Sequence, residues 1–188
     1  MGSTKDTVEE IVAACRSMVG LPYDGEPVDQ LEHALQCAAL AREQHADDAE
    51  FVVACLLHDI ARAPAVAGIP YDGTREHHGE AGARWLTPRA GARVAWLAEQ
   101  HVPAKRFLVA TDPAYRDRLS EVSQRTLLAQ GGAMSEAEIA EFRGNYDWEQ
   151  AVALRLFDDL AKEPGLPVPD IDSYRTELTI VVSSVAGS

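Results

Sequence analysis

The 188-residue sequence is poor in cations: 17 lysines and arginines stand against 30 aspartates and glutamates, which gives a net charge of −13. Binding to nucleic acid or to an anionic membrane surface needs clustered cations, so we expect neither partner. Long apolar runs are lacking too, because no stretch approaches the roughly 20 consecutive apolar residues of a membrane-spanning helix.

Cysteine is also scarce. Cys15, Cys37 and Cys55 cannot all pair, none belongs to a closely spaced pair of metal ligands, and each lies in an apolar stretch. We therefore expect reduced, buried thiols and a reducing compartment. The first residues contain no apolar run of signal-peptide length, and Asp6 stands where a myristoylation motif needs serine or threonine. The expected location is cytoplasmic.

The remaining composition, 46% hydrophobic and 25% charged, is that of an ordinary soluble globular protein, and the length predicts a single domain over 1–188. Apolar residues recur with helical spacing and no alternating strand pattern is evident, so the predicted fold class is all-α. The expected helices cover about 5–18, 28–44, 48–63, 77–86, 90–101, 104–110, 114–119, 122–129, 136–144 and 147–162, before a proline-rich loop and a final short helix.

Two of the expected helices are apolar nearly all round, which is typical of buried helices. The helix at 28–44 nevertheless carries His33, and the helix at 48–63 carries His58 and Asp59. Polar groups taken out of water need partners, and an ionised aspartate needs a cation or strong donors. These residues are therefore candidates for a buried polar site.

The other histidines extend this pattern, except for His45, which follows the apolar face of its helix and is expected to face solvent. Any single histidine of this kind is more often an ordinary core residue or a cap than a ligand. A dispersed set with Asp59, which can bridge two cations, favours a transition-metal site of mixed nitrogen and oxygen ligands. The set comprises His33, His58, Asp59, His77 or His78, His101 and Asp158.

The spacing H…HD…H…H…D resembles the signature of the HD-domain superfamily, an all-α metal-binding fold. Most members are phosphohydrolases, and a smaller branch are mixed-valent di-iron oxygenases. The segments LEHALQCAALA and LLHDIA are similar to that branch, and specifically to the enzymes of the PhnZ and TmpB type that cleave the carbon–phosphorus bond of 1-hydroxyphosphonates. The resemblance also includes YDGEPVDQLEHALQCA, HVPAKRFL, LSEVSQRTLLAQGGAMSEAE and LRLFDDLAK. Together these blocks cover a core at about 23–162.

The resemblance implies a helical bundle with a buried dinuclear site. One iron would be held by His33, His58, Asp59 and Asp158, and the second by the bridging Asp59 with His78 and His101. His78 fits the family pattern H-x-x-x-G-A-x-x-L, with Gly82, Ala83 and Leu86, whereas His77 stays open as an alternative ligand or as a support for one.

Lys105, Ser123 and Gln130 match the phosphonate-binding positions of the family. A cation and two neutral hydrogen-bonding side chains suit a phosphonate dianion. Taken singly, Lys105 could be a solvated surface charge and Ser123 a helix cap. Gly131 and Gly132 follow Gln130 in a turn whose backbone can approach an anion.

Tyr23 and Glu26 match the Tyr-x-x-Glu motif of a mobile gate, in which the phenolate caps one iron and the glutamate contacts the distal group of the substrate. The alternative is a plain loop aromatic and a carboxylate at a helix entry. Arg62 departs from the aminophosphonate enzyme of the family, which has a pocket histidine there. Arg62 could bind the phosphonate or a second anionic group, or it could be a surface cation at a helix end.

The resemblance therefore implies an O2-dependent di-iron oxygenase with an Fe(II)/Fe(III) centre, which converts a small organophosphonate to phosphate and a carboxylic acid. The alternative is a metal-dependent phosphohydrolase on the same scaffold, acting on a nucleotide or small phosphate ester with Lys105 and Arg62 stabilising charge. A regulatory module that binds without turnover ranks last, since no ligand is missing. The expected assembly is a monomer or a small homo-oligomer.

Overall fold

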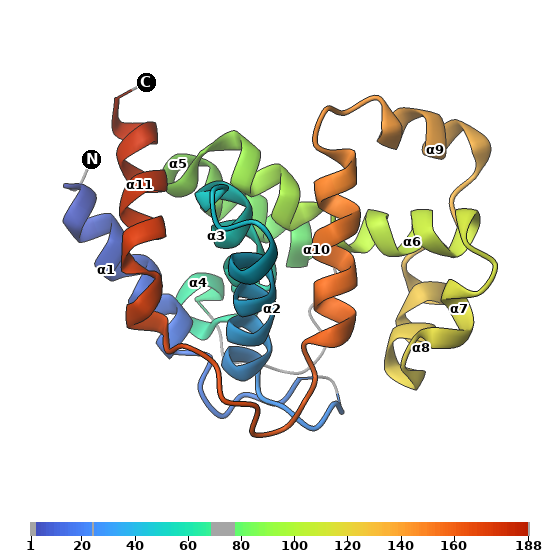
Figure 1. Ribbon diagram of the computed structural model, residues 1–188, viewed down its shortest axis with the longest axis horizontal. Helices are drawn as coiled ribbons and strands as arrows, with labels where there is room; N and C mark the ends of the chain where they lie inside the picture. Colours follow the sequence, from blue (N-terminus) through green and yellow to red (C-terminus); the bar gives the residue numbers. More distant parts are fainter. Residues whose placement is uncertain (1–2, 24, 69–77, 188) are drawn as a thin grey trace.

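The computed structural model of the protein describes residues 3–23, 25–68 and 78–187. Within these ranges the chain forms helices and no strand, which confirms the all-α prediction (Figure 1). The elements are α1 (Thr4–Arg16), α2 (Gln30–Gln44), α3 (Ala49–Leu57), η1 (Ile60–Arg62), α4 (Pro64–Ala67), α5 (His78–Glu99), α6 (His101–Thr111), α7 (Tyr115–Arg118), α8 (Glu121–Ala129), α9 (Glu136–Arg143), α10 (Trp148–Leu160), η2 (Ile171–Tyr174) and α11 (Arg175–Ala186).

Helix α3 is the centre of the core. Every residue from Phe51 to Leu57 is buried, and α3 packs against α2, α5, α10 and α11. Helix α1 covers α11 on the outer side. Helices α6 to α9 extend to one side of this bundle and join it where α10 packs on α6 (Figure 1). None of the described helices is both long enough and apolar enough to cross a membrane.

The helix that carries the His-Asp pair is shorter than the sequence predicted. A single helix was expected over 48–63, but α3 ends at Leu57 and His58 is its C-cap. Ala63 is extended, with φ −61° and ψ 127°, because the ring of Pro64 disfavours a helical residue before it. Pro64 then begins the short helix α4, where a missing N–H costs nothing, in place of the loop we expected. His58 and Asp59 lie at the end of the buried helix, as expected, but in the short segment between α3 and η1.

Two other ligand candidates also lie at helix starts. Two helices were expected at 77–86 and 90–101, and α5, which spans His78–Glu99, consists of two helical stretches that meet at a kink at Gly91. Gly91 has φ 87°, a backbone conformation that glycine adopts at little cost. Helix α6 starts at His101, three residues earlier than predicted.

The three cysteines are free and buried, as predicted. The prediction for His45 was wrong: its ring is half-buried and lies edge-on to Phe51, with ring centroids 4.7 Å apart. The final helix α11 is also longer than the short helix we expected, at 12 residues. The single-domain organisation stays a prediction.

Candidate metal centre and its pocket

One group of ligand candidates joins α2, the end of α3 and α10. The Nε2 atoms of His33 and His58 lie 3.1 Å apart, and Oδ1 of Asp158 lies 3.4 Å from Nε2 of His33. All three side chains are buried, and their ligand atoms lie within 4.8 Å of one another. This spacing would allow one metal ion to contact all three.

A second group joins the segment after α3 to the first residues of α5 and α6. Nε2 of His78 lies 2.8 Å from Nε2 of His101, and Oδ1 of Asp59 lies 3.1 Å and 3.7 Å from these two nitrogens. These side chains are buried too, and they form the second set of three whose ligand atoms lie within 4.8 Å. His77, the alternative to His78, lies outside the described residues.

Asp59 stands between the two groups. Its Oδ1 faces His78 and His101, whereas its Oδ2 lies 3.8 Å from Nε2 of His58 in the first group. Oδ1 is buried and makes no well-formed hydrogen bond within the described part of the chain, although Nε of Arg62 lies 3.3 Å from it. A buried carboxylate is stabilised by cations that bind it directly. The donor set therefore fits two metal ions that share one carboxylate.

Main-chain carbonyls orient three of the imidazole rings. Nδ1 of His33 donates to the carbonyl of Ala161 at 2.8 Å, and Nδ1 of His58 donates to that of Cys55 at 2.9 Å. Nδ1 of His101 donates to the carbonyl of Ala98 at 2.6 Å. A carbonyl can only accept, so in the neutral ring the proton is on Nδ1 and the lone pair is on Nε2. Each Nε2 is thereby prepared to bind a metal ion.

The electrostatics of the groups favour the metal-binding protonation states. Burial lowers the pKa of His33 to about 4 and that of His101 to about 3, so both rings are neutral at pH 7. Burial opposes ionisation of Asp59, but Arg62 and His58 hold the pKa of this carboxyl well below its usual range. Burial also disfavours charge on His58, yet the Asp59 carboxylate and Cys37 raise its pKa to about 10. Without metal the centre thus retains a proton on His58, which a bound cation would replace.

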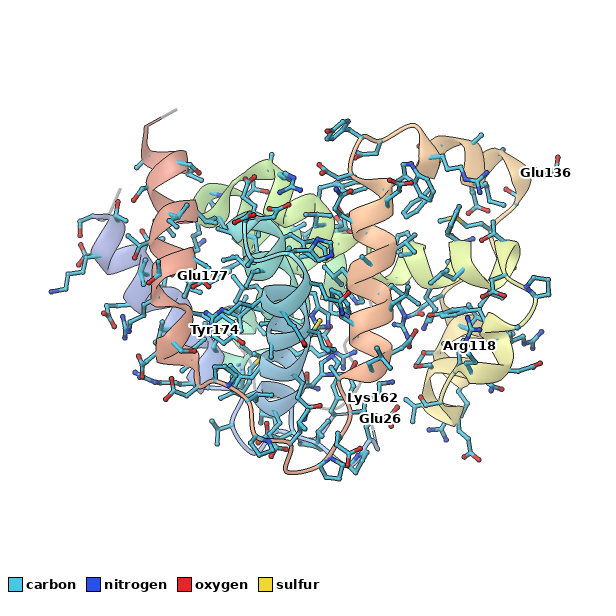
Figure 2. The ribbon with its side chains drawn as sticks, viewed as in Figure 1. Glu26, Arg118, Glu136, Lys162, Tyr174 and Glu177 are labelled. Atoms are coloured by element: carbon cyan, nitrogen blue, oxygen red, sulfur yellow. The ribbon has the colours of Figure 1, made fainter. Side chains whose placement is uncertain are left out.

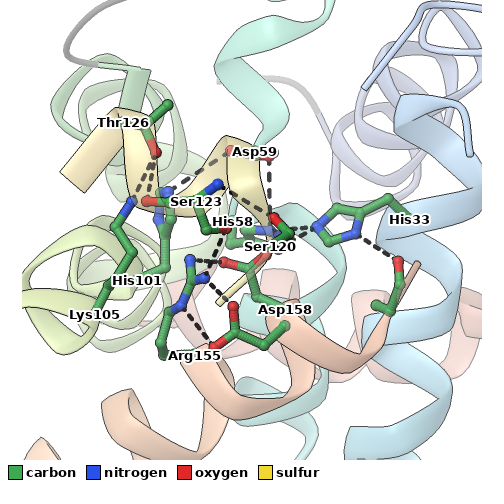
Figure 3. A network of polar contacts seen from close by, with 12 residues as sticks. His33, His58, Asp59, His101, Lys105, Ser120, Ser123, Thr126, Arg155 and Asp158 are labelled. Carbon is green, nitrogen blue, oxygen red and sulfur yellow. Dashed lines mark hydrogen bonds and ion pairs between the residues drawn. The ribbon is translucent and has the colours of Figure 1, made fainter. Parts of the chain in front are cut away.

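Arg155 supports the first group from α10, and sequence reasoning missed it. Its Nη1 donates to Oδ2 of Asp158 at 2.6 Å (Figure 3). Arg155 also pairs with Asp159. Burial alone would raise the pKa of Asp158, but the Arg155 guanidinium keeps it below the usual range. The available signal was the spacing, since residues three apart lie on the same face of a helix.

A pocket of about 50 Å³ opens onto both groups. Among the predicted site residues only His33 and His58 are not on its wall, and they lie behind Asp158 and Asp59. The wall is formed by Tyr23, Glu26, Asp59, Arg62, His78, His101, Val102, Lys105, Val122, Ser123, Thr126, Gln130, Arg155, Asp158 and Lys162. The structure therefore brings the predicted metal ligands and the predicted substrate residues together, although their roles stay predictions.

Lys105 and Ser123 both point into this pocket. Lys105 is 2% exposed, so the surface-charge alternative is wrong, and its Nζ donates to Oγ1 of Thr126 at 2.9 Å (Figure 3). Burial, helped by Arg155, lowers the pKa of Lys105 to about 8. The cap of α8 is Ser120 rather than Ser123, which leaves the Ser123 hydroxyl 3.4 Å from Nζ of Lys162.

Gln130 ends the same helix. Its Oε1 is buried in the pocket wall and has no hydrogen-bond partner among the described residues. Gly131 and Gly132 have φ values of 96° and 70°, which confirms the predicted tight turn. Arg106 binds this turn by donating to the carbonyl of Gly132 at 3.0 Å.

Tyr23 covers the first group. Its ring stacks on His33 with centroids 3.9 Å apart, and its hydroxyl donates to Oδ1 of Asp158 at 3.1 Å. Burial and the Asp158 carboxylate raise the pKa of Tyr23 well above its usual value, so in the metal-free centre it is a neutral donor. The phenolate that the family resemblance implies would need a bound cation.

Glu26 forms hydrogen bonds with two residues that precede α8 and follow α10. Its Oε1 accepts a hydrogen bond from Oγ of Ser120 at 2.6 Å and one from Nζ of Lys162 at 3.0 Å. Figure 2 shows Glu26 and Lys162 side by side below the end of α10. Lys162 was not predicted as a site residue, and no spacing rule links it to Glu26, which is distant in sequence.

Arg62 is a pocket residue rather than a surface cation. It is 8% exposed, and its Nε lies 3.3 Å from Oδ1 of Asp59. Its guanidinium carbon lies 5.9 Å from the centre of the Tyr23 ring. Arg62 therefore places a permanent positive charge beside Asp59 and Tyr23.

Comparison with known proteins agrees with this geometry. The HD domain family matches residues 31–129. The chain is 42% identical over 166 residues to hydroxymethylphosphonate dioxygenase of Gimesia maris, covering 85% of this chain and 80% of the relative. It is 41% identical over 150 residues to 1-hydroxy-2-(trimethylamino)ethylphosphonate dioxygenase (glycine-betaine-forming) of Leisingera caerulea, covering 79% and 76%. An uncharacterized protein of Acanthamoeba polyphaga mimivirus is 31% identical over 172 residues, covering 89% and 78%.

The chain therefore belongs to the HD domain family. Its relatives and its paired histidine and aspartate groups make it a metal-dependent enzyme of the dioxygenase type, as the sequence motifs indicated.

Proposed function

We propose that the protein binds two iron ions and uses dioxygen to cleave the carbon–phosphorus bond of a small 1-hydroxyphosphonate, with phosphate and a carboxylic acid as products. The observation that carries the proposal is the Asp59 carboxylate, which turns one oxygen to each of two buried ligand groups. The reaction class is supported by the two relatives that are named as phosphonate dioxygenases.

In this proposal His33, His58 and Asp158 hold one ion, His78 and His101 hold the other, and Asp59 is shared. A mixed set of imidazole and carboxylate ligands is typical of non-haem iron sites, whereas thiolate-rich or all-oxygen ligand sets suit other metals. When bound, the irons would acidify the hydroxyl of the substrate and supply the redox chemistry with dioxygen. The protein keeps the rings aimed through the carbonyls of Ala161, Cys55 and Ala98.

Lys105, Ser123 and Gln130 would bind the phosphonate. The described contact of Lys105, to Thr126, uses one of its three donors, which leaves others for phosphonate oxygens. The Ser123 hydroxyl lies 3.5 Å from Nη2 of Arg155, so an anion beside it also feels that guanidinium. Because the site is largely withdrawn from water, these charges act through a low dielectric and are worth more than at the surface.

Tyr23 and Glu26 would close the pocket. Tyr23 shields His33 and Asp158 from solvent, and Glu26 connects the start of α8 to the residue Lys162 beyond α10. Admission of a substrate requires these contacts to loosen, and their return excludes water during the reaction. Such a gate protects an oxidising centre from reacting without its substrate.

The test is phosphate release from hydroxymethylphosphonate by iron-loaded protein, with and without oxygen. We expect release only in the presence of oxygen, matched by oxygen consumption, together with a low-temperature EPR signal whose average g value lies below that of the free electron. Asp59→Asn protein should show no phosphate release, no oxygen consumption and no such EPR signal. Hydrolysis of phosphate esters under nitrogen with Mn(II), Mg(II) or Co(II), and no oxygen-dependent release, would instead establish a phosphohydrolase.

A further inference from the structure

Lys162 lies between the gate formed by Tyr23 and Glu26 and the residues proposed to bind the phosphonate. Its Nζ donates to Oε1 of Glu26 at 3.0 Å (Figure 2). The same nitrogen lies 3.4 Å from Oγ of Ser123. The side chain of Lys162 is 13% exposed and forms part of the pocket wall. One ammonium group therefore contacts both a gate carboxylate and a proposed phosphonate residue.

The two contacts of Lys162 differ in strength. Burial opposes ionisation of Glu26, but hydrogen bonds from Ser120 and Lys162 hold its pKa below the usual value, so Glu26 is a carboxylate at neutral pH. Its contact with Lys162 is a charge-assisted hydrogen bond, whereas Ser123 offers only a neutral hydroxyl at a longer distance. A phosphonate oxygen bound at Ser123 carries negative charge, so it would be a much stronger acceptor for Lys162 than that hydroxyl.

The main chain beside Lys162 is fixed on both sides. The carbonyl of Ala161 accepts from Nδ1 of His33 at 2.8 Å. The side chain of Gln36, which is 2% exposed, donates to the carbonyl of Glu163 at 2.7 Å and accepts from its N–H at 3.1 Å. Both attachments come from α2, so Lys162 can change its partner only by rotation of its own side chain.

Tyr23 and Glu26 belong to one turn, because the N–H of Glu26 donates to the carbonyl of Tyr23 at 2.8 Å. Among the described residues, the side chain of Glu26 is hydrogen-bonded to Ser120 and Lys162. Loss of the Lys162 contact therefore weakens the attachment of the turn that carries Tyr23.

We infer that Lys162 is a further phosphonate-binding residue, and that it releases Glu26 when the anion binds beside Ser123. The carboxylate and the phosphonate compete for one ammonium group, and they also repel one another in a poorly hydrated pocket. Binding of the anion thus loosens the gate, and by linkage the closed gate opposes binding of the anion. The contact of Glu26 with Ser120 can re-form while the anion is bound, whereas Lys162 returns only after phosphate has left. The inference rests on the proposed function, because it uses the phosphonate position given there.

The first experiment measures the affinity of metal-loaded protein for methylphosphonate, which has no distal group for Glu26 to contact, by calorimetric titration under nitrogen. Lys162→Met should weaken binding at least about fivefold, whereas Glu26→Gln should tighten it about fivefold because it frees Lys162. Lys162→Arg, which keeps the charge, should retain most of the wild-type affinity. Glu121→Gln and Arg125→Met, at exposed positions on α8, are the matched controls and should leave the affinity unchanged.

Opposite signs for the two halves of one ion pair are the decisive result. If the pair only held the gate shut, Lys162→Met and Glu26→Gln would change the affinity in the same direction. That outcome at native metal content would overturn the inference, as would the absence of measurable methylphosphonate binding to the wild-type protein.

The second experiment follows the gate itself through amide hydrogen exchange in the segment 25–29. Saturating methylphosphonate should accelerate exchange there in the wild-type protein, because the Lys162 contact is lost. In Lys162→Met and in Glu26→Gln the exchange should be fast already and should not respond further to the ligand, since the contact to be broken is absent. Unchanged or slower exchange in the saturated wild-type protein would refute the release of Glu26.

Turnover separates this inference from the proposed function. Methylphosphonate lacks the 1-hydroxyl, so neither experiment depends on the reaction. If hydroxymethylphosphonate releases no phosphate in air, the proposed function fails, and the methylphosphonate data still decide the role of Lys162. If phosphate is released but the two substitutions change the affinity in the same direction, the inference fails and the proposed function stands.

Discussion

Arg155 holds Asp158 from behind: its Nη1 donates to Oδ2 at 2.6 Å, while Oδ1 of the same carboxylate faces His33 at 3.4 Å. Both side chains are almost completely buried, at 5% and 2% exposure. If Oδ1 binds a metal ion as proposed, the carboxylate would do so ionised and in a fixed orientation, because the guanidinium binds the other oxygen.

Arg155→Met should destabilise the protein and weaken metal binding at the first group. Removal of Arg155 takes away the strongest counter-charge of the buried Asp158, and the loss of one partner of a buried ion pair costs about 3–5 kcal/mol. Urea unfolding of the metal-free protein measures the first effect, and metal analysis after dialysis measures the second. Arg125→Met, at an exposed position on α8, should change neither. Full stability and full metal content in Arg155→Met would contradict this account.

Asp59→Asn should reduce the metal content from two ions per chain to one or none. The amide keeps the shape of the side chain but removes the charge that both ligand groups face. Metal analysis of protein loaded under nitrogen gives the stoichiometry. Asp47→Asn, at an exposed position, serves as the control and should retain two ions. Two tightly held ions in the Asp59 variant would show that this carboxylate does not bridge.

Affinity for methylphosphonate should fall as the pH rises through 8. Lys105 has a pKa of about 8 in place of 10.5, because burial disfavours its charge, so the ammonium is lost above that pH. Calorimetric titration should show a loss approaching tenfold per pH unit well above pH 8. Lys105→Arg should bind with little pH dependence there, since a guanidinium stays protonated. An unchanged pH profile in Lys105→Arg would exclude Lys105 as its source.

The lowered pKa of Lys105 should also affect stability, and here a rise in pH is favourable rather than unfavourable. The folded-state pKa of Lys105 lies below the unfolded value, so between pH 8 and 10.5 the unfolded chain binds the extra proton. The contribution of Lys105 to the free energy of unfolding should therefore increase across that window. The difference between wild type and Lys105→Met in urea unfolding, measured at several pH values, checks the sign.

Glu26→Gln and Lys162→Met should act non-additively. The two side chains form a half-buried ion pair on the pocket wall. The first substitution already removes the stabilising free energy of this pair, so the second should add little to the loss. A double-mutant cycle by urea unfolding should give a coupling free energy of about 1–2 kcal/mol. The exposed pair of Glu80 and Arg84 provides the control and should give less than about 0.5 kcal/mol. Equal coupling in both pairs would mean that Glu26 and Lys162 form an ordinary surface contact.

The sequence allowed the all-α class and the gathering of the ligand candidates to be predicted, for a clear physical reason. Histidines and aspartates on helices that are otherwise apolar must find partners in the core, so their convergence follows from burial alone. The helix boundaries around these residues were harder to predict from the sequence. Pro64 accounts for the extended Ala63, but α3 ends six residues before Ala63, and η1, which follows it, packs against α5 in a contact that the local sequence does not reveal.

Lys162 and Ser120 could not be predicted to lie at the pocket in the same way, whereas Arg155 was missed although its spacing to Asp158 was visible. Charged and hydroxyl side chains are usually solvated, so periodicity assigns them to the surface. Their roles arise from tertiary neighbours: Ser120 and Lys162 meet Glu26, which is 94 and 136 residues away in the chain. His45 was misplaced for the related reason that Phe51 and Phe157 lie beside it only in the folded bundle.

The carbonyls of Cys55, Ala98 and Ala161 aim three imidazole rings, and every residue type carries such a carbonyl. The orientation of these rings consequently depends on the path of the main chain and not on which side chains the three carbonyl-bearing residues have. Side chains at the three positions can be exchanged, within the room that the core allows, without turning a ring. An insertion or deletion in α3 or α5 is different, because one residue rotates the following helix by about 100° and carries the carbonyl away. Over evolutionary time this centre should therefore tolerate drift in composition around the rings far better than changes in helix length.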